Sequence, residues 1–425
     1  MQSEGRAMTP PAERAMTPPA ERAMTPPAER AMTQPAERAM KRDVRLLFFC
    51  QALMNASVVG QVAMGALVGY SLASDKALAT LPLALQMVAT MAASIPAGII
   101  FSRLGRRFGF LVGATGSFIG ALVFALGVWM GDFWVYSAGA IPAGIGFGIA
   151  QHYRFAAAEV ASPAYRPRAI SLVMAGGVLA AIFGPELVKH SKDMFAPFLF
   201  LGTYLLLSLL PIICAVLLTI VRLPPAPPRP KVATPVFEII RRPAFIAAAG
   251  TAAMAYGTMN LLMTSTPLEM MACGFGVGAS ATVIQAHAVA MFGPGFFTGR
   301  LITRWGTRRI IAAGVGLNLL CVGVAIQGES FGHFVAALVL LGLGWNFMFT
   351  GATTLLGEAH RPEERVRAQT ANDFIVFGTV ACTALASGAI HAGAGWAALN
   401  LLVLPALAVA LGLTLWRWAP AAKAA

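Results

Sequence analysis

Twelve long apolar runs, separated by short polar segments, make up most of the chain after residue 43. Each run has about 20 residues, the length with which an α-helix crosses roughly 30 Å of hydrocarbon. A backbone exposed to lipid must satisfy its own hydrogen bonds, so we expect every run to be a helix. The runs begin near Val44, Leu78, Phe108, Phe133, Ala169, Phe198, Ala244, Ala279, Ile310, Phe334, Thr370 and Trp396.

Two polar segments interrupt this pattern. An eight-residue unit, Arg6-Ala-Met-Thr-Pro-Pro-Ala-Glu13, repeats from Arg14, Arg22 and Arg30 and has no apolar face to bury. We therefore predict a disordered tail over residues 1–43. The proline-rich segment 222–243 is expected to be an extended cytoplasmic linker. The predicted organisation is the tail, a six-helix bundle over 44–221, the linker, a second six-helix bundle over 244–418 and a C-terminal tail over 419–425.

Composition and charge agree with a membrane protein. Hydrophobic residues make up 57% and charged residues 12% of the chain, which excludes an ordinary soluble domain. If both termini lie on one side, alternate loops place all 31 Lys and Arg on that side except Lys76, Lys189 and Lys192. The positive-inside rule makes this side cytoplasmic. The net charge of +13 then reflects topology, and we expect a monomer in the lipid bilayer of a bacterial inner membrane, without nucleic acid as a partner.

A glycine-bounded, arginine-rich motif occurs twice. Gly98-Ile-Ile-Phe-Ser-Arg-Leu-Gly-Arg-Arg107 and Gly299-Arg-Leu-Ile-Thr-Arg-Trp-Gly-Thr-Arg-Arg309 are 201 residues apart, and each follows an apolar run. The motif resembles the loop 2–3 signature of the major facilitator superfamily, a family of secondary transporters. This resemblance implies an all-α membrane fold of twelve transmembrane helices, arranged as two pseudo-symmetric six-helix bundles.

A second duplicated element, Glu followed after six residues by Arg, resembles one that ends spans four and ten in sugar-porter branches of that superfamily. The resemblance implies two cytoplasmic clusters that form a latch through charge-assisted hydrogen bonds. The alternative is that these charges only set topology. The clusters are Arg103, Arg107, Glu159 and Arg166 in the first half, and Arg304, Arg308, Glu358 and Arg365 in the second.

The chain departs from the family pattern at several positions. Ser102 and Thr303 stand where the loop signature has aspartate, so the latch would depend more on the two glutamates. Ala140 aligns with the span-four arginine of proton-coupled drug exporters. Gly184-Pro185 matches the antiporter signature of span five only in part.

Polar side chains near the middle of the apolar runs are candidates for substrate binding, because transporters of this architecture bind their solute near the bilayer midplane. Polar groups facing lipid at that depth are costly, so we expect them to face the cavity. The alternative for each is a hydrogen bond to a neighbouring helix. The candidates are Gln51, Asn55, Gln86, Tyr256, Asn260, His287, Trp345 and Asn346.

Two of the ionisable residues are candidates for proton coupling. His287 lies near the midplane and carries an imidazole that titrates near neutrality. Asp373 is the deepest carboxylate, about 9 Å along the helix from Arg367. It is either a proton carrier or the partner of a cytoplasmic arginine.

Enzyme and nucleotide-driven functions find no support in the sequence. A phosphate-binding loop of the Gly-Lys-Ser/Thr kind is missing, and the five cysteines show no metal-ligand spacing, so we expect no cofactor and no metal site. The predicted function is secondary active transport of a small organic solute by alternating access, coupled to protons. The alternatives are a drug or metabolite exporter working by proton antiport, and a transport-inactive membrane assembly or sensory factor.

Overall fold

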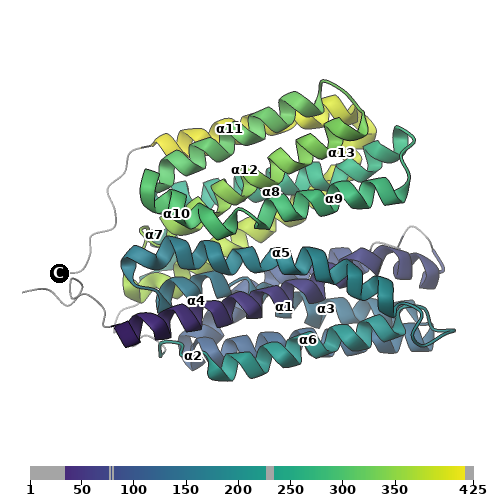
Figure 1. The fold of residues 1–425 in the computed structure, drawn as a ribbon, viewed down its shortest axis with the longest axis horizontal. Coiled ribbons are helices and arrows are strands. Elements are labelled where there is room, and N and C mark those ends of the chain that lie inside the picture. The colour runs from purple at the N-terminus through teal and green to yellow at the C-terminus, as the bar shows by residue number, and fades with distance from the viewer. Residues whose placement is uncertain (1–33, 76–77, 79–80, 226–233, 417–425) are drawn as a thin grey trace, which may run out of the picture. The chain divides into compact units, whose positions relative to one another are not determined.

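The computed structural model describes residues 34–75, 78, 81–225 and 234–416, and the regular elements in these ranges are all helical (Figure 1). The chain divides into two units, residues 1–40 and 41–425, and the second contains every described helix except the first residues of α1. Before the linker lie α1 (Gln34–Leu72), α2 (Leu81–Met130), α3 (Phe133–Ala150), α4 (Tyr153–Val160), η3 (Pro163–Tyr165), α5 (Arg166–Ser191) and α6 (Leu201–Ile220). From residue 236 onward lie α7 (Val236–Ile240), α8 (Pro243–Ala272), α9 (Val277–Phe292), α10 (Gly295–Trp305), α11 (Thr307–Ala325), α12 (Phe331–Leu356), η4 (Pro362–Glu364) and α13 (Arg365–Leu415).

The twelve predicted runs all correspond to described helices. Nine segments of the described residues are long and apolar enough to cross a membrane. One of them, α2, bends at Gly105 and so supplies two crossings, while the bend of α13 at Gly395 separates two others. The runs near Val44 and Ala279 correspond to α1 and to the pair α9 and α10. The all-α membrane fold is confirmed.

Helix α1 begins at Gln34, well before the predicted boundary at residue 43. In the last repeat Gln34 replaces a proline, and Pro35 falls in the first turn, where its missing N–H costs little. Residues 34–43 are therefore helical, contrary to the prediction, and residues 1–33 lie outside the described part. The short helix α7 likewise lies within the segment predicted to be extended, of which residues 226–233 are not described.

The duplicated motif forms a duplicated turn. Gly105 has φ 84° and Gly306 has φ 89°, a left-handed conformation that L side chains rarely adopt. Both glycines occupy the same position of the motif. Each half of the chain therefore bends in the same way between its second and third crossings.

The helices of each half pack mainly with one another. In the first half α2 packs with α3 and α6, and in the second α8 packs with α12 and α13 while α11 lies on α12 (Figure 1). The two halves meet where α13 packs on α2, and where α5 contacts α9, α10 and α12. These contacts between halves position the charged groups of the candidate site.

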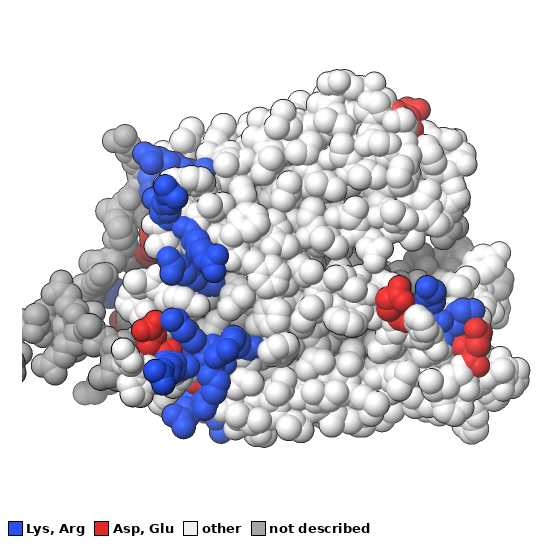
Figure 2. Space-filling view, in the orientation of Figure 1, with Lys and Arg blue, Asp and Glu red and all other residues white. Residues whose placement is uncertain are grey.

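Basic side chains gather at one end of the helices (Figure 2). We call this the arginine end and define it by the two bends and their arginines: Arg103, Arg106, Arg107, Arg304 and Arg308. The opposite end, called the distal end, is defined by Asp132, Glu186, Glu269 and Glu329. The segregation follows the pattern expected from alternating loops.

Candidate functional site

A buried ion pair joins the two halves. Arg154 of α4 donates from Nη2 to Oδ1 of Asp373 on α13 over 2.5 Å, and the two side chains are 2% and 0% exposed. Asn372 donates to the same oxygen over 2.8 Å. The other oxygen, Oδ2, has no hydrogen-bond partner among the described residues and lies 3.6 Å from Nδ1 of His152. A buried charge that loses its partner is strongly destabilising, so this pair favours contact between the halves.

The partner of Asp373 was missed in the sequence. Arg367, six residues before Asp373, donates instead to the carbonyl oxygen of Thr234 over 2.7 Å. Ala140 was aligned with the span-four arginine of proton-coupled drug exporters, and Arg154 was overlooked. The available signal was a lone arginine at the end of an apolar run. The guanidinium of Arg154 also lies over the rings of Phe155 and Phe349, at 4.5 and 4.9 Å from their centroids.

A second charged network lies closer to the arginine end. Glu159 accepts hydrogen bonds from Nη2 of Arg106 over 2.6 Å and lies 3.1 Å from Nε of Arg365, which belongs to the other half. Arg106 also donates to Oε1 of Gln369 on α13. The side chain of Glu159 is only 3% exposed. One carboxylate is therefore shared by two arginines from opposite halves.

The membership of the first predicted cluster is corrected by this geometry. Arg106 takes the place expected for Arg103 and Arg107, because the helix restarts after the Gly105 bend with Arg106 buried against α4. Arg103 and Arg107 are exposed, and Arg107 donates to the carbonyl oxygen of Val221 over 2.7 Å. Arg166 is also exposed and lies near Arg365.

The second predicted cluster is not a copy of the first. Arg365 was expected beside Glu358 and instead crosses to Glu159. Burial of the Glu358 carboxyl group raises the pKa of this residue, and the guanidinium of Arg308 opposes the rise. Arg304 is exposed, with its guanidinium 5.8 Å from the ring centroid of Trp305. The duplicated sequence therefore gives one inter-half network in the described ranges, not two equal ones.

The first glycine of each motif permits close approach of the halves. A Cβ at Gly299 would lie 2.5 Å from the carbonyl oxygen of Pro167 on α5, and one at Gly98 would overlap the side chain of Thr370 on α13. The backbone N–H of Gly299 donates to Oγ of Ser171 over 2.9 Å. Both motifs thus place a small residue at an equivalent contact between halves.

The polar candidates of the first half hydrogen-bond within it. Gln51 donates to Oδ1 of Asn55 one turn later over 2.8 Å. Gln86 donates to Oε1 of Gln61 on α1 over 3.2 Å. The structure brings Gln51 and Asn55 together, and it joins Gln86 to a residue outside the predicted set.

Three polar candidates of the second half bind neighbouring helices. Asn346 accepts from Oγ1 of Thr298 over 2.6 Å and donates to the carbonyl oxygen of Met291 over 2.8 Å. Asn260 donates to the carbonyl oxygen of Val380 over 3.2 Å. His287 is fully buried, with Nδ1 2.8 Å from the carbonyl oxygen of Leu338. Each of the three side chains therefore has a hydrogen-bond partner on a neighbouring helix, while Nε2 of His287 has none among the described residues. Their part in substrate binding stays a prediction.

The remaining candidates, Tyr256 and Trp345, meet in a group of five rings. We call it the aromatic cluster, and it consists of Tyr256, Phe292, Trp345, Phe349 and Phe377. Trp345 stacks on Phe349 with centroids 5.0 Å apart and planes 15° apart, and Tyr256 meets both rings edge-on. The indole N–H of Trp345 has no hydrogen-bond partner in the described part of the chain. Phe349 connects the cluster to Arg154.

The inter-half contacts of the described side chains lie toward the arginine end. They include the Arg154–Asp373 pair, the Glu159 network and the two glycine contacts. A pocket of about 170 Å³ lies between the halves there, and its lining includes Arg166, Glu358, His360 and Gln369. The structure is therefore closed at the arginine end.

Comparison with known proteins identifies the family. The sequence profile of the Major Facilitator Superfamily matches residues 46–326 and 287–425. The chain belongs to this superfamily. It is 38% identical over 389 residues to the riboflavin transporter RfnT of Brucella anthropi, covering 91% of this chain and 98% of that protein. It is also 28% identical to the uncharacterized MFS-type transporter YdeG of Bacillus subtilis, over 85% of this chain and 88% of that protein.

Solved structures of superfamily members share the fold. The transporter FucP in its outward conformation aligns with a TM-score of 0.72 at 15% identity, covering 87% of this chain and 97% of FucP. The human organic anion transporter MFSD10 aligns with a TM-score of 0.73 at 14% identity, covering 88% and 99%. This superfamily protein is therefore a multi-pass membrane transporter of a small molecule and not an enzyme.

Proposed function

We propose that this transporter carries riboflavin or a flavin with the same ring system. The observation that carries the proposal is the 38% identity to a riboflavin transporter over nearly the full length of both proteins. The aromatic cluster supports it independently. A flavin is a planar aromatic ring system with polar edges, and aromatic side chains bind such a ring by stacking, each contact contributing about 0.5–1.5 kcal/mol beyond burial.

Three features of the cluster support the proposal. Tyr256 and Phe292 are only partly buried, whereas the other three rings of the cluster are buried. Trp345 offers an N–H without a partner among the described residues, a donor for a ring carbonyl or ring nitrogen of the flavin. Arg154 lies on Phe349, the ring on which Trp345 also stacks. Bound flavin would therefore lie close to the ion pair that joins the halves.

Replacing Trp345 with leucine is expected to weaken riboflavin binding at least about tenfold, because a stacking surface and an N–H donor are both lost. Quenching of flavin fluorescence by the purified protein measures the affinity. Trp305→Leu is the matched control, since Trp305 is 50% exposed at the arginine end and lies outside the cluster.

The two variants also test the proposed substrate and the proposed site separately. If riboflavin binds neither variant nor the parent protein, the substrate proposal fails. If Trp345→Leu and Trp305→Leu both bind like the parent protein, the cluster is not the site. Uptake of labelled riboflavin by cells without their own transporter tests whether the bound flavin is also the transported solute.

We further propose alternating access coupled to protons at Asp373. Oδ1 of Asp373 already accepts from Arg154 and Asn372, whereas Oδ2 has no donor among the described residues and faces His152. A proton on Oδ2 would neutralise the carboxylate, weaken its attraction to Arg154 and favour separation of the halves at the arginine end. Substrate near Phe349 and a proton on Asp373 would thus act on the same contact.

The arginine end is proposed to be cytoplasmic, with both termini on that side of a bacterial inner membrane. In a variant without native cysteines, a cysteine at Asp132 of the distal end should react with an impermeant thiol reagent in intact cells. A cysteine at the exposed Pro225, in the linker, should react only after the membrane is permeabilised. Labelling of Pro225→Cys in intact cells would reverse the assigned orientation.

A further inference from the structure

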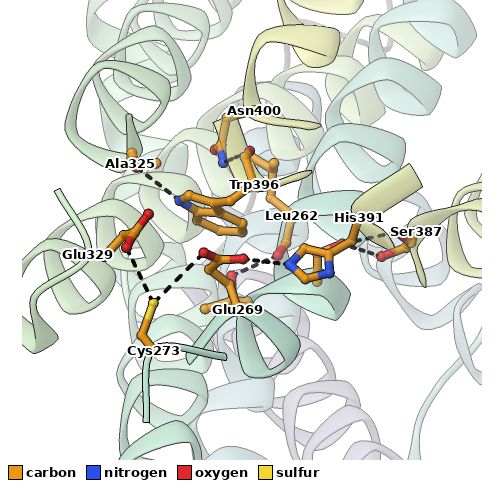
Figure 3. Close-up of polar contacts among 11 residues, drawn as sticks. Leu262, Glu269, Cys273, Ala325, Glu329, Ser387, His391, Trp396 and Asn400 are labelled. Carbon is orange, nitrogen blue, oxygen red and sulfur yellow. Dashed lines mark hydrogen bonds and ion pairs between the residues drawn. The ribbon is translucent and has the colours of Figure 1, made fainter. Parts of the chain in front are cut away.

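Four side chains with metal-binding groups converge at the distal end of the second half (Figure 3). Glu269 lies in the last turn of α8, Cys273 directly follows that helix, Glu329 lies between α11 and α12, and His391 lies on α13. The thiol sulfur of Cys273 is 3.8 Å from Oε1 of Glu269 and 3.5 Å from Oε2 of Glu329. Nε2 of His391 is 2.6 Å from the other oxygen of Glu269. None of these residues belongs to the proposed flavin site or to the inter-half contacts.

The donor spacing matches a tetrahedral metal. Zinc binds thiolate sulfur at about 2.3 Å and carboxylate oxygen at about 2.0–2.2 Å, which places sulfur and oxygen about 3.6 Å apart in a tetrahedral site. The two sulfur–oxygen distances here are 3.5 and 3.8 Å. One donor atom from each of Glu269, Cys273 and Glu329 lies within 4.8 Å of the other two. Only small side-chain movements would bring them around one cation.

The surroundings favour a cation. Two carboxylates share the cluster, and in the described part of the second half no Lys or Arg lies at the distal end. The thiol lies within hydrogen-bonding distance of both carboxylates, to which its proton is donated. A divalent cation would displace that proton and neutralise the cluster.

We propose that Glu269, Cys273 and Glu329 form an exchangeable binding site for Zn²⁺ that opens to the distal face of the transporter. Three protein ligands leave a fourth position for water, as in open zinc sites. Glu329 is exposed and gives the cation a route of entry. The thiolate selects zinc over Ca²⁺ and Mg²⁺, which take oxygen ligands.

His391 is the positioning residue of the site. Its hydrogen bond to Oε2 of Glu269 leaves Oε1 directed toward Cys273. Close by on α13, the indole of Trp396 donates to the carbonyl oxygen of Ala325 over 2.9 Å and so ties α13 to the end of α11, from which the segment with Glu329 continues (Figure 3). Bound zinc would link the end of α8 to this segment and, through His391, to α13. Zinc should therefore stabilise the folded protein.

The test titrates Zn²⁺ into the full-length purified protein after removal of trace metal with a chelator. Calorimetry should show one equivalent bound, with a matching rise in melting temperature. Cys273→Ser and Glu329→Gln should each lose this equivalent, and His391→Ala should weaken affinity about 10–100-fold. Cd²⁺ should add ultraviolet thiolate-to-metal absorption that Cys273→Ser lacks. Cys382→Ser and His190→Ala, which change an exposed thiol and an exposed histidine elsewhere, should bind zinc like the parent protein.

Any of three results would overturn the site: no binding of zinc by the parent protein, unchanged affinity in both Cys273→Ser and Glu329→Gln, or Cd²⁺ binding without thiolate absorption. Equal affinity for Ca²⁺ would contradict the assigned selectivity. Cys273→Ser and Glu329→Gln both alter groups near the distal surface. Their melting temperatures, measured with a chelator and without zinc, show whether each variant folds, independently of zinc binding.

Discussion

Replacing Asp373 with asparagine is expected to open the arginine end and to abolish coupled transport. The change leaves the guanidinium of Arg154 buried without a countercharge, which costs about 3–5 kcal/mol. Arginine cannot lose its proton, so relief comes only from hydration when the halves separate. At about 1.4 kcal/mol per factor of ten, the conformational equilibrium should shift at least about a hundredfold toward opening. Spin-label distances between cysteines at Leu104 and Trp305, both exposed at the arginine end, should lengthen.

The double variant Asp373→Asn with Arg154→Met is the control for this result. Removing both charges should restore most of the closed population, because a neutral buried contact carries no unpaired charge. It should not restore uptake driven by a pH gradient, since the proposed proton carrier is still missing. Distances that stay unchanged in Asp373→Asn would show that the pair does not hold the halves together. Gradient-driven uptake by the double variant would remove Asp373 from the coupling step.

The sequence predicted the helices well because crossing a membrane imposes a length and an apolar composition. All twelve runs correspond to helices, and the two motif glycines, Gly105 and Gly306, form equivalent bends. The beginning of α1 was predicted less well. Its first turn contains Gln34 and Pro35 of the last repeat, and proline is tolerated in a first turn.

The site was harder to predict because sequence gives depth along a helix but not the direction of a side chain. Asn260, His287 and Asn346 lie at similar depth, yet each hydrogen-bonds to a helix beside it. Arg106 and Arg107 are adjacent, but only Arg106 reaches Glu159. Rotation about the helix axis depends on packing between distant segments, which a single sequence does not specify.

The four residues Glu269, Cys273, Glu329 and His391 at the distal end were even harder to predict from the sequence. Cys273 and Glu269 are one turn apart, but Glu329 and His391 come from segments that only the fold brings beside them. Ligand spacing in sequence indicates a metal site when the ligands share a loop or a helix. Here Glu329 lies far along the chain from Glu269 and Cys273, so the spacing of the ligands in the sequence does not indicate the site.

The pseudo-symmetry of the chain supplies a matched pair for the last prediction. Glu159→Gln is expected to weaken closure of the arginine end by about 1.5–3 kcal/mol, whereas Glu358→Gln should change it by less than about 1 kcal/mol. Glu159 is buried between Arg106 and Arg365, so its neutral replacement leaves two guanidinium groups facing one another. Glu358 lines the pocket near Arg308, a residue of its own half, and within the described ranges it makes no ion pair to the first half.

The spin-label distance between Leu104 and Trp305 should therefore lengthen in Glu159→Gln and stay close to the parent value in Glu358→Gln. Both substitutions remove one negative charge from the same end of the molecule, so a general effect of charge on topology would act on them alike. Equal responses would show that the duplicated glutamates act only through that general effect. A longer distance in Glu159→Gln alone requires a contact that the second glutamate lacks, and the carboxylate shared by Arg106 and Arg365 is that contact.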